Sequence, residues 1–199
     1  MVAIPPKLLT AEDFIAQYGD NPRYELIDGE LRNLEPTGPH EDVAGTLAII
    51  IGAEIRRLSF NWAIPKSCLI QTLAANATVL RPDVIALDRD ALQNEPLWQR
   101  EPMITSGQAI RFVAEVVSTN WQDDYARKAE EYFLLRIPEY WIIDFRALGG
   151  LAFIGNPKQP TITVCTLQTT GYSQQQFRMN DAIVSAVFPE LQLALQDLI

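Results

Sequence analysis

The stretch that decides the fold is residues 110–145, which read IRFVAEVVSTNWQDDYARKAEEYFLLRIPEYWIIDF. Two nearly continuous apolar runs, 110–117 and 139–145, flank a segment over 121–136 whose aromatic residues recur at helical spacing. Strands that are apolar along their whole length are buried on both faces of a sheet. Near-continuous strands joined through a helix therefore predict a mixed sheet that is covered on both faces.

Two further helices and a hairpin are expected before this unit. Thr10 is a suitable N-cap for a short helix, because an acid follows three residues later. Asp28-Gly29 favours positive φ and predicts a two-residue hairpin turn. Apolar residues at spacings of three and four predict a long helix from about His40 to Ser59.

Four further strands are expected, of which the two that follow residue 145 are shorter. They are predicted over 63–73, 78–87, 151–155 and 161–167. Residues 89–108 contain two prolines and a glycine and are interpreted as a surface excursion. The order helix, three strands, helix, strand predicts an α/β fold, a mixed sheet flanked by helices with an N-terminal hairpin and C-terminal strands.

Composition sets limits on function. The chain has 199 residues, 48% of them hydrophobic, with two cysteines and one histidine, which exclude a disulfide framework, a thiolate metal site and a two-imidazole site. No apolar run approaches the ~18 residues that span a bilayer. Residues 1–7 lack a charged segment followed by an apolar one, so we expect no signal peptide and a cytoplasmic protein. The net charge of −9 argues against a surface that binds nucleic acid everywhere.

Two acids interrupt apolar strands. Glu115 lies within the run 110–117, and Asp83 stands at the start of the run 83–87. A buried carboxylate without a partner costs several kcal/mol or is neutralised. If the two strands are neighbours, the carboxylates converge and require a cation, and oxygen ligands suit Mg²⁺ or Mn²⁺. The alternative is that Asp83 lies in a hydrated loop and that Glu115 pairs with Arg111.

Lys128 is the third candidate. Trp121, Tyr125, Lys128 and Tyr132 share one face of the helix expected over 121–136. Because that face is rich in aromatic residues, a lysine on it either extends to water or points at an anion. The helix begins just after the strand that carries Glu115, so Lys128 can reach the carboxylate pair. Two carboxylates, a divalent ion and a lysine suit phosphodiester hydrolysis.

Several segments in this order resemble the Uma family of restriction endonucleases, which belongs to the PD-(D/E)xK nuclease superfamily. The segments are Tyr24-Glu25-Leu26-Ile27-Asp28-Gly29-Glu30-Leu31, Arg81-Pro82-Asp83-Val84, Glu115-Val116-Val117-Ser118 and Pro138-Glu139-Tyr140-Trp141-Ile142-Ile143-Asp144, with Lys128 and Tyr132 between the last two. The resemblance covers most of the chain. It implies one restriction endonuclease-like domain over 1–199, with an N-terminal arm over 1–36, a core over 40–145 and C-terminal strands over 149–199.

The resemblance also implies an activity. It implies hydrolysis of DNA that depends on Mg²⁺ or Mn²⁺, with Asp83 and Glu115 as metal ligands, Lys128 as the catalytic lysine, and a homodimer that cuts two strands. The superfamily motif has its lysine two residues after the acid, where this chain has Val117, so Lys128 would replace it from the following helix. Glu30 and His40 are possible accessory residues, and Glu25 flanks the same hairpin turn as Glu30 and could also line the metal cleft. Exposed strand acids and an exposed histidine at a helix start are the simpler interpretations.

Two other functions remain open. A non-catalytic binding or regulatory module on a degenerate nuclease fold would agree with the acidic charge and with Val117 at the motif position. A hydrolase of small phosphate esters would use the same acids. Metal-dependent cleavage that disappears when Asp83 is replaced by alanine would exclude the first, and comparison of an aryl phosphodiester with duplex DNA would test the second.

Overall fold

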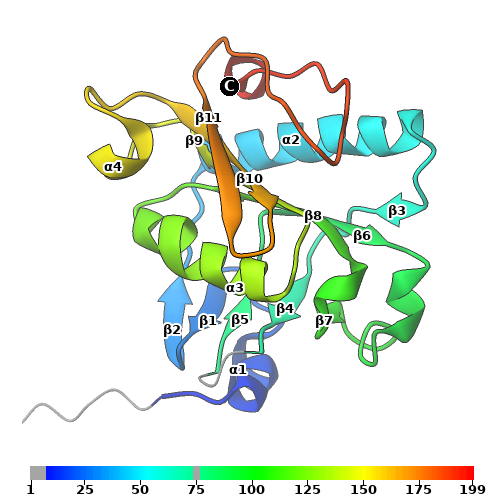
Figure 1. The fold of residues 1–199 in the computed structure, drawn as a ribbon. Helices are drawn as coiled ribbons and strands as arrows, with labels where there is room; N and C mark the ends of the chain where they lie inside the picture. Colours follow the sequence, from blue (N-terminus) through cyan, green and yellow to red (C-terminus); the bar gives the residue numbers. More distant parts are fainter. Residues whose placement is uncertain (1–7, 74–76) are drawn as a thin grey trace, which may run out of the picture.

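The fold is built around two mixed sheets, which Figure 1 shows in a computed structural model of the chain. The structure describes residues 8–73 and 77–199. Residues 1–7, on which the expectation of no signal peptide rests, lie outside the described residues. Over the described ranges, no helix combines the length and the apolar character that crossing a membrane requires.

The larger sheet has six strands in the order β11-β10-β9-β8-β6-β3. They are β3 (Trp62–Ala63), β6 (Val84–Asp88), β8 (Ile110–Val116), β9 (Glu139–Asp144), β10 (Thr161–Leu167) and β11 (Tyr172–Phe177). β8 and β9 are parallel, and the other neighbouring pairs are antiparallel. The sheet is therefore mixed, as the sequence predicts, and its two most apolar strands lie in its centre.

The smaller sheet has five strands in the order β2-β1-β5-β4-β7. They are β1 (Tyr24–Ile27), β2 (Glu30–Asn33), β4 (Leu69–Gln71), β5 (Val79–Leu80) and β7 (Met103–Ile104). The expected hairpin is confirmed, with Asp28 at φ 52° and Gly29 at φ 80° in the turn. Helix α1 (Ala11–Tyr18) begins at the predicted capping box of Thr10 and Asp13 and packs its buried Phe14 against this sheet.

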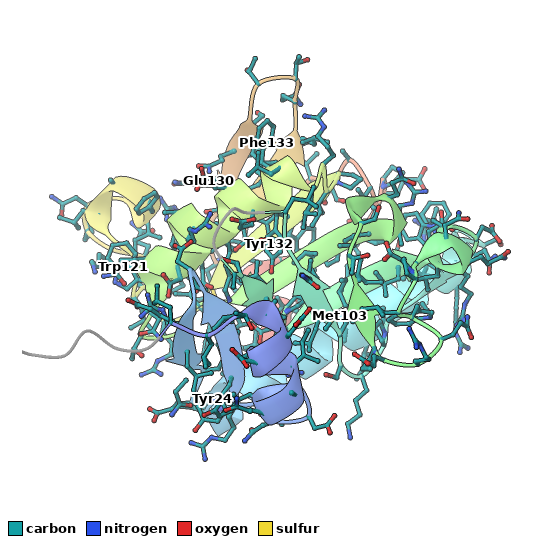
Figure 2. All side chains as sticks on the ribbon, turned by 90° about the horizontal axis from the view of Figure 1, so that it is seen from below. Tyr24, Met103, Trp121, Glu130, Tyr132 and Phe133 are labelled. Carbon is teal, nitrogen blue, oxygen red and sulfur yellow. The ribbon has the colours of Figure 1, made fainter. Side chains whose placement is uncertain are left out.

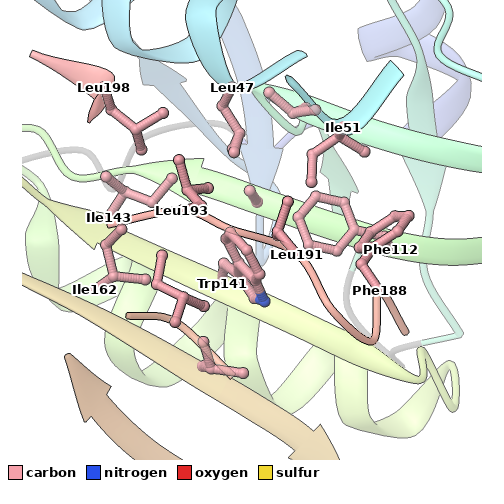
Figure 3. Packing of buried hydrophobic residues seen from close by; sticks show 14 of the residues in the cluster. Leu47, Ile51, Phe112, Trp141, Ile143, Ile162, Phe188, Leu191, Leu193 and Leu198 are labelled. Atoms are coloured by element: carbon pink, nitrogen blue, oxygen red, sulfur yellow. The ribbon is translucent and has the colours of Figure 1, made fainter. Parts of the chain in front are cut away.

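Both faces of the larger sheet are covered. Phe112, Ala114 and Val116 of β8 pack on one side with helix α2 (Gly38–Arg57) and the C-terminal residues 183–198. Figure 3 shows Leu47 of α2 and Leu193 of that C-terminal segment in this cluster. The alternate residues of β8 face the helical segment 121–134 on the other side. Odd-numbered residues of β8, Glu115 among them, therefore point toward that helical segment.

Two expected strands are divided between the sheets, and each break lies at a proline. The strand predicted over 78–87 separates into β5 and β6, because Pro82 has no N–H to donate and Arg81 donates from its side chain to the carbonyl oxygens of Gly19 and Tyr24. The strand predicted over 63–73 separates into β3 and β4 around Pro65. Each segment thus crosses from one sheet to the other.

Three other expectations need correction. Residues 89–108 are not simply a surface excursion, since β7 and two short 3-10 helices, η1 (Ala91–Asn94) and η2 (Gly107–Ala109), lie there and Met103 is buried. Near 151–155 the structure has a helix, α4 (Leu151–Ile154), because the edge of β9 is already paired with β10. The long helix over 121–136 contains a π-helical turn, η3 (Asp123–Arg127), before α3 (Lys128–Leu134).

Glu139 fastens the C-terminal segment to the sheet. Its fully buried carboxylate accepts hydrogen bonds from the Trp141 indole, the Ser185 hydroxyl and the backbone N–H groups of Ala186 and Val187. The segment then continues through the buried Phe188 to a last 3-10 helix, η4 (Leu195–Leu198). The C-terminal residues therefore belong to the core of the larger sheet.

Candidate active site

The sheet register brings the two predicted acids together. β6 and β8 are antiparallel, with Val84 opposite Ala114, so the next step along the ladder places Asp83 opposite Glu115. Residues that are opposite in an antiparallel pair point to the same face. Oδ2 of Asp83 also accepts a hydrogen bond of 2.7 Å from the backbone N–H of Val116. The alternative pairing of Glu115 with Arg111 is wrong, because Arg111 pairs with Asp88.

Lys128 meets three carboxylates at this place. Its Nζ lies 3.3 Å from Oε2 of Glu115, 3.3 Å from Oε1 of Glu25 and 3.2 Å from Oδ1 of Asp124. The side chains of all four residues are at most 7% exposed. Tyr132, one turn further along the helix, donates from its hydroxyl to Oε1 of Glu115 at 2.5 Å. Figure 2 shows Tyr132 pointing into the molecule, whereas Glu130 and Phe133 lie on the outer side of the helix.

The π-helical turn η3 explains how the helix presents these side chains. A π turn is wider than an α turn and is frequent at functional sites. In η3 the consecutive residues Asp124 and Tyr125 are both buried, and Lys128 follows at the start of α3. Two neighbouring side chains and the lysine therefore face the sheet. The predicted inward face of this helix is confirmed, with Asp124 as an addition.

The two accessory residues from the sequence have different positions. Glu30 is an exposed strand residue that pairs with Arg32, and it does not line the cavity next to Glu115. His40 is buried at the start of α2, with Nε2 2.9 Å from the carbonyl oxygen of Val116 and 3.3 Å from Oδ2 of Asp83. Because the carbonyl only accepts, Nε2 carries the proton. His40 thus contacts a candidate metal ligand.

The site carries more negative charge than its lysine balances. Burial raises the pKa of Glu115 well above its usual value, and the charges of Asp83, Asp124 and Glu25 add to that effect against the opposing ammonium of Lys128. Burial likewise raises the pKa of Glu25, and it raises the pKa of Asp124 to about 7. Burial alone would lower the pKa of Lys128, but the surrounding carboxylates outweigh it and raise that pKa well above its usual value.

A cavity of about 580 Å³ opens onto these groups. Asp83, Glu115, Asp124 and Lys128 line it, together with four prolines and the acids Asp20 and Glu41. Its other cations are Lys66 and Arg81, and the Arg81 guanidinium is bound to Gly19, Tyr24 and Ser67. Arg127 does not join them and pairs instead with Asp28, Glu130 and Glu131. Of the cations Arg81, Arg127 and Lys128, two therefore line this cavity, and Arg127 lies outside it.

The donor set fits a small divalent cation. Mg²⁺ usually takes one or two carboxylates and completes its octahedron with water and substrate phosphate oxygens. Asp83 and Glu115 supply two carboxylates on one cavity wall, in surroundings with an excess of negative charge. In the part of the chain that the structure describes, no group of three or more His, Cys, Asp or Glu is arranged to hold a metal. The residues therefore suit a two-carboxylate site rather than a closed protein cage.

Two site residues have weak signals in the sequence. Glu25 stands in a short, polar-flanked strand, so its burial depends on contacts with Lys128 and Arg81, which are distant in the chain. Asp124 follows Asp123 in a segment that looks like the acidic first turn of an exposed helix. Its position four residues before Lys128 is the one signal that indicates a partner. The sequence therefore offers Glu25 only as one of two acids beside the hairpin turn, and it does not single out Asp124.

Comparisons with known proteins give a family and a fold. A family model named Uma2 and described as "Putative restriction endonuclease" matches residues 11–196. Among solved structures, a "putative nuclease belonging to DUF820" from Anabaena variabilis ATCC 29413 is similar, with a TM-score of 0.68 and 18% identity, over 96% of this chain and 97% of that chain. At this identity the likeness shows the fold. No curated protein matches the chain.

Proposed function

Because the chain belongs to the Uma2 family, as the resemblance in its sequence indicates, we propose that it is a divalent-metal-dependent endonuclease that hydrolyses phosphodiester bonds of DNA. One observation carries this proposal. Asp83, Glu115 and Lys128, which come from different elements, line one cavity, and Nζ of Lys128 lies 3.3 Å from Oε2 of Glu115. Carboxylates and an ammonium at one cavity wall are the groups that phosphodiester hydrolysis needs.

Asp83 and Glu115 are the proposed metal ligands, with Mg²⁺ or Mn²⁺ as the cation. When bound, such an ion polarises a phosphate and lowers the pKa of a coordinated water. Tyr132 fixes the orientation of Glu115 by its hydrogen bond to Oε1. The backbone N–H of Val116 does the same for Asp83, and His40 supports both Asp83 and the carbonyl oxygen of Val116.

Lys128 is the proposed electrostatic catalyst. Its ammonium is a compact positive charge at the cavity wall, where it stabilises the negative charge that develops as a phosphate is attacked. The carboxylates around it keep it protonated, since they raise its pKa well above the usual value despite its burial. The ammonium therefore acts as a charge and not as a base.

Metal binding is the first experiment, because it needs no knowledge of a recognition sequence. We expect calorimetric titration with Mn²⁺ to show binding by the wild type and none by Glu115→Gln or Asp83→Asn. Glu41→Gln is the matched control, since Glu41 lines the same cavity with a side chain that is 66% exposed. Unchanged binding by Glu115→Gln would refute the ligand assignment.

Cleavage of supercoiled plasmid is the second experiment. We expect nicking or linearisation that requires Mn²⁺ or Mg²⁺ and that disappears in Glu115→Gln and in Lys128→Met, with the activity of Glu41→Gln retained. A wild type that neither binds Mn²⁺ nor cleaves would favour the non-catalytic module. Turnover of an aryl phosphodiester with no action on DNA would favour the small-ester hydrolase.

A homodimer belongs to the same proposal, because cutting both strands of a duplex calls for two copies of a single site. The expected assembly has twice the chain mass of 22.4 kDa. Light scattering during size-exclusion chromatography, with and without DNA, measures that mass. A monomer under both conditions would limit the enzyme to nicking one strand at a time.

A further inference from the structure

We infer that Glu25 and Asp124 are positioning residues that hold the ammonium of Lys128, so that the N-terminal hairpin completes the active site. This inference rests on the proposed function and assigns roles to two acids outside the set of Asp83, Glu115 and Lys128. It also makes the hairpin a part of the active site, whereas the sequence predicts it as part of an N-terminal arm that precedes the core.

The geometry of the ammonium carries the inference. Glu25, Glu115 and Asp124 place one oxygen each within 3.2–3.3 Å of Nζ of Lys128, which matches three N–H donors with three carboxyl oxygens. Glu115 approaches from β8, Asp124 from the π turn η3 and Glu25 from β1 of the other sheet. An ammonium that is shared in this way has a fixed position at the cavity wall.

Glu25 lies behind the ammonium rather than on the cavity. Lys128, Asp124 and Glu115 line the cavity. Glu25 does not line it, and its side chain is only 2% exposed. Its second oxygen, Oε2, accepts from the backbone N–H of Arg81 at 3.3 Å. Glu25 therefore acts on the cavity through Lys128. Its own position is fixed at Arg81, where the chain passes from β5 of the smaller sheet to β6 of the larger sheet.

The rest of the hairpin is tied to the same helical segment. Asp28 in the hairpin turn pairs with Arg127 at 2.9 Å, and Arg32 of β2 lies 3.8 Å from Asp123. Together with Glu25 and Lys128, these contacts join three positions of the hairpin to three positions around η3. The hairpin thus holds the turn that presents Asp124 and Lys128.

A purely structural role explains this arrangement less well. Buried ion clusters cost desolvation free energy, and apolar residues of similar volume often replace them with no loss of stability. Here three acids converge on one lysine, and that lysine lines a cavity. The cluster defines the place of a charge, which a catalytic site requires and a hydrophobic core does not.

The test uses Glu25→Gln and Asp124→Asn in the full chain, with Glu131→Gln as the matched control. Glu131 is buried on the same helix and pairs with Arg127, away from Lys128. The first readout is the NMR signal of the Lys128 ammonium in protein with ¹⁵N-labelled lysine, identified by its loss in Lys128→Met. We expect both variants to shift or broaden that signal and Glu131→Gln to leave it unchanged.

The second readout is the split between kcat and KM on plasmid DNA. We expect kcat to fall about 10- to 100-fold, in the range that a misplaced catalytic group costs, with KM and the Kd for Mn²⁺ within about twofold of the wild type. A higher KM at unchanged kcat, or an unchanged ammonium signal in both variants, would overturn the inference. If the wild type lacks activity, the proposed function fails, and the ammonium signal still decides whether these acids hold Lys128.

Discussion

At the residue scale, Glu115 shows how the fold and the proposed chemistry constrain one side chain. The residue is 1% exposed in the central strand β8, between residues that pack on both faces of the sheet. Its two oxygens are nevertheless satisfied, one by the Tyr132 hydroxyl and one by the Lys128 ammonium. A buried carboxylate is tolerated only with such partners, and the cavity that Glu115 lines makes it a functional candidate.

Tyr132→Phe tests the contribution of the hydrogen bond between the Tyr132 hydroxyl and Glu115. The variant removes the donor to Oε1 of Glu115 and leaves a buried carboxylate oxygen without that hydrogen bond. We expect a loss of about 1–3 kcal/mol in the free energy of unfolding, measured by urea denaturation. Tyr172→Phe is the control, because that hydroxyl donates to a neutral carbonyl at a partly buried site, and a smaller loss is expected. Equal losses in the two variants would contradict the special status of the Glu115 contact.

The sequence predicts the residues that break an apolar pattern and misses those that do not. Asp83, Glu115 and Lys128 each interrupt a buried run or an aromatic helix face, and the structure places all three at one cavity. Asp124 sits in polar surroundings along the chain, and Glu25 lies in a strand of only four residues, where an acid is typical of an exposed position; only contacts between distant segments bury them. The pattern of apolar and polar residues along the chain does not indicate contacts between distant segments.

At the scale of elements, the apolar segments that stay in one sheet are predictable from the sequence, and those that pass from one sheet to the other are not. The nearly continuous apolar runs behind β8 and β9 predict strands that are buried on both faces, and the structure buries six of the seven residues of β8 and all six of β9. The segments 63–73 and 78–87 have the right composition for single strands. Their division between two sheets depends on Pro65 and Pro82 and on the anchoring of Arg81, which composition does not reveal.

Glycines give a paired prediction for two elements. A Cβ at Gly107 in η2 would lie 1.8 Å from the backbone oxygen of Leu135, and neither backbone can give way easily. We expect Gly107→Ala to lower the free energy of unfolding by at least about 2 kcal/mol. Gly45 lies on the exposed side of α2 with no atom within 4 Å of an added Cβ, so Gly45→Ala should stabilise by about 0.5–1 kcal/mol. Chemical denaturation measures the free energy of unfolding of both variants. Changes of the same sign in the two variants would contradict this packing.

The C-terminal segment gives the second prediction at this scale. Phe188 is fully buried, with its ring centroid 5.5 Å from that of Phe112 and 6.0 Å from that of Trp62. We expect Phe188→Ala to cost about 3–5 kcal/mol in the free energy of unfolding. The nearby Val184 is 63% exposed, and Val184→Ala should stay within about 0.5 kcal/mol of the wild type. A small effect of Phe188→Ala would mean that the segment is not part of the core.

At the scale of the whole molecule, we propose that the chain is one domain, because ion pairs and covering segments join its parts. The hairpin pairs with η3, and the C-terminal segment packs under α2 on the larger sheet. A net charge of −9 surrounds a site whose proposed substrate is an anion. Attraction of DNA therefore has to come from local charge at the cavity, since the total field opposes it.

Lys66 is the residue on which that local attraction should depend. The charged groups of Arg81 and Lys128 are bound to other residues of the chain. Lys66, by contrast, is exposed at the cavity and has no ion-pair partner among the described residues. We expect Lys66→Glu to raise the KM for DNA several-fold at low salt, with kcat retained, and to reduce the slope of binding against salt by about one charge.

Lys158→Glu is the matched control, because it makes the same charge change at an exposed lysine that lies outside the cavity. The total charge of the two variants is identical, so a difference between them isolates the position of the charge from its amount. DNA affinity measured by fluorescence anisotropy from low to moderate salt supplies the comparison. Equal weakening in both variants would show that DNA senses the net charge of the molecule, and flat affinity across salt would contradict phosphate contact at the cavity altogether.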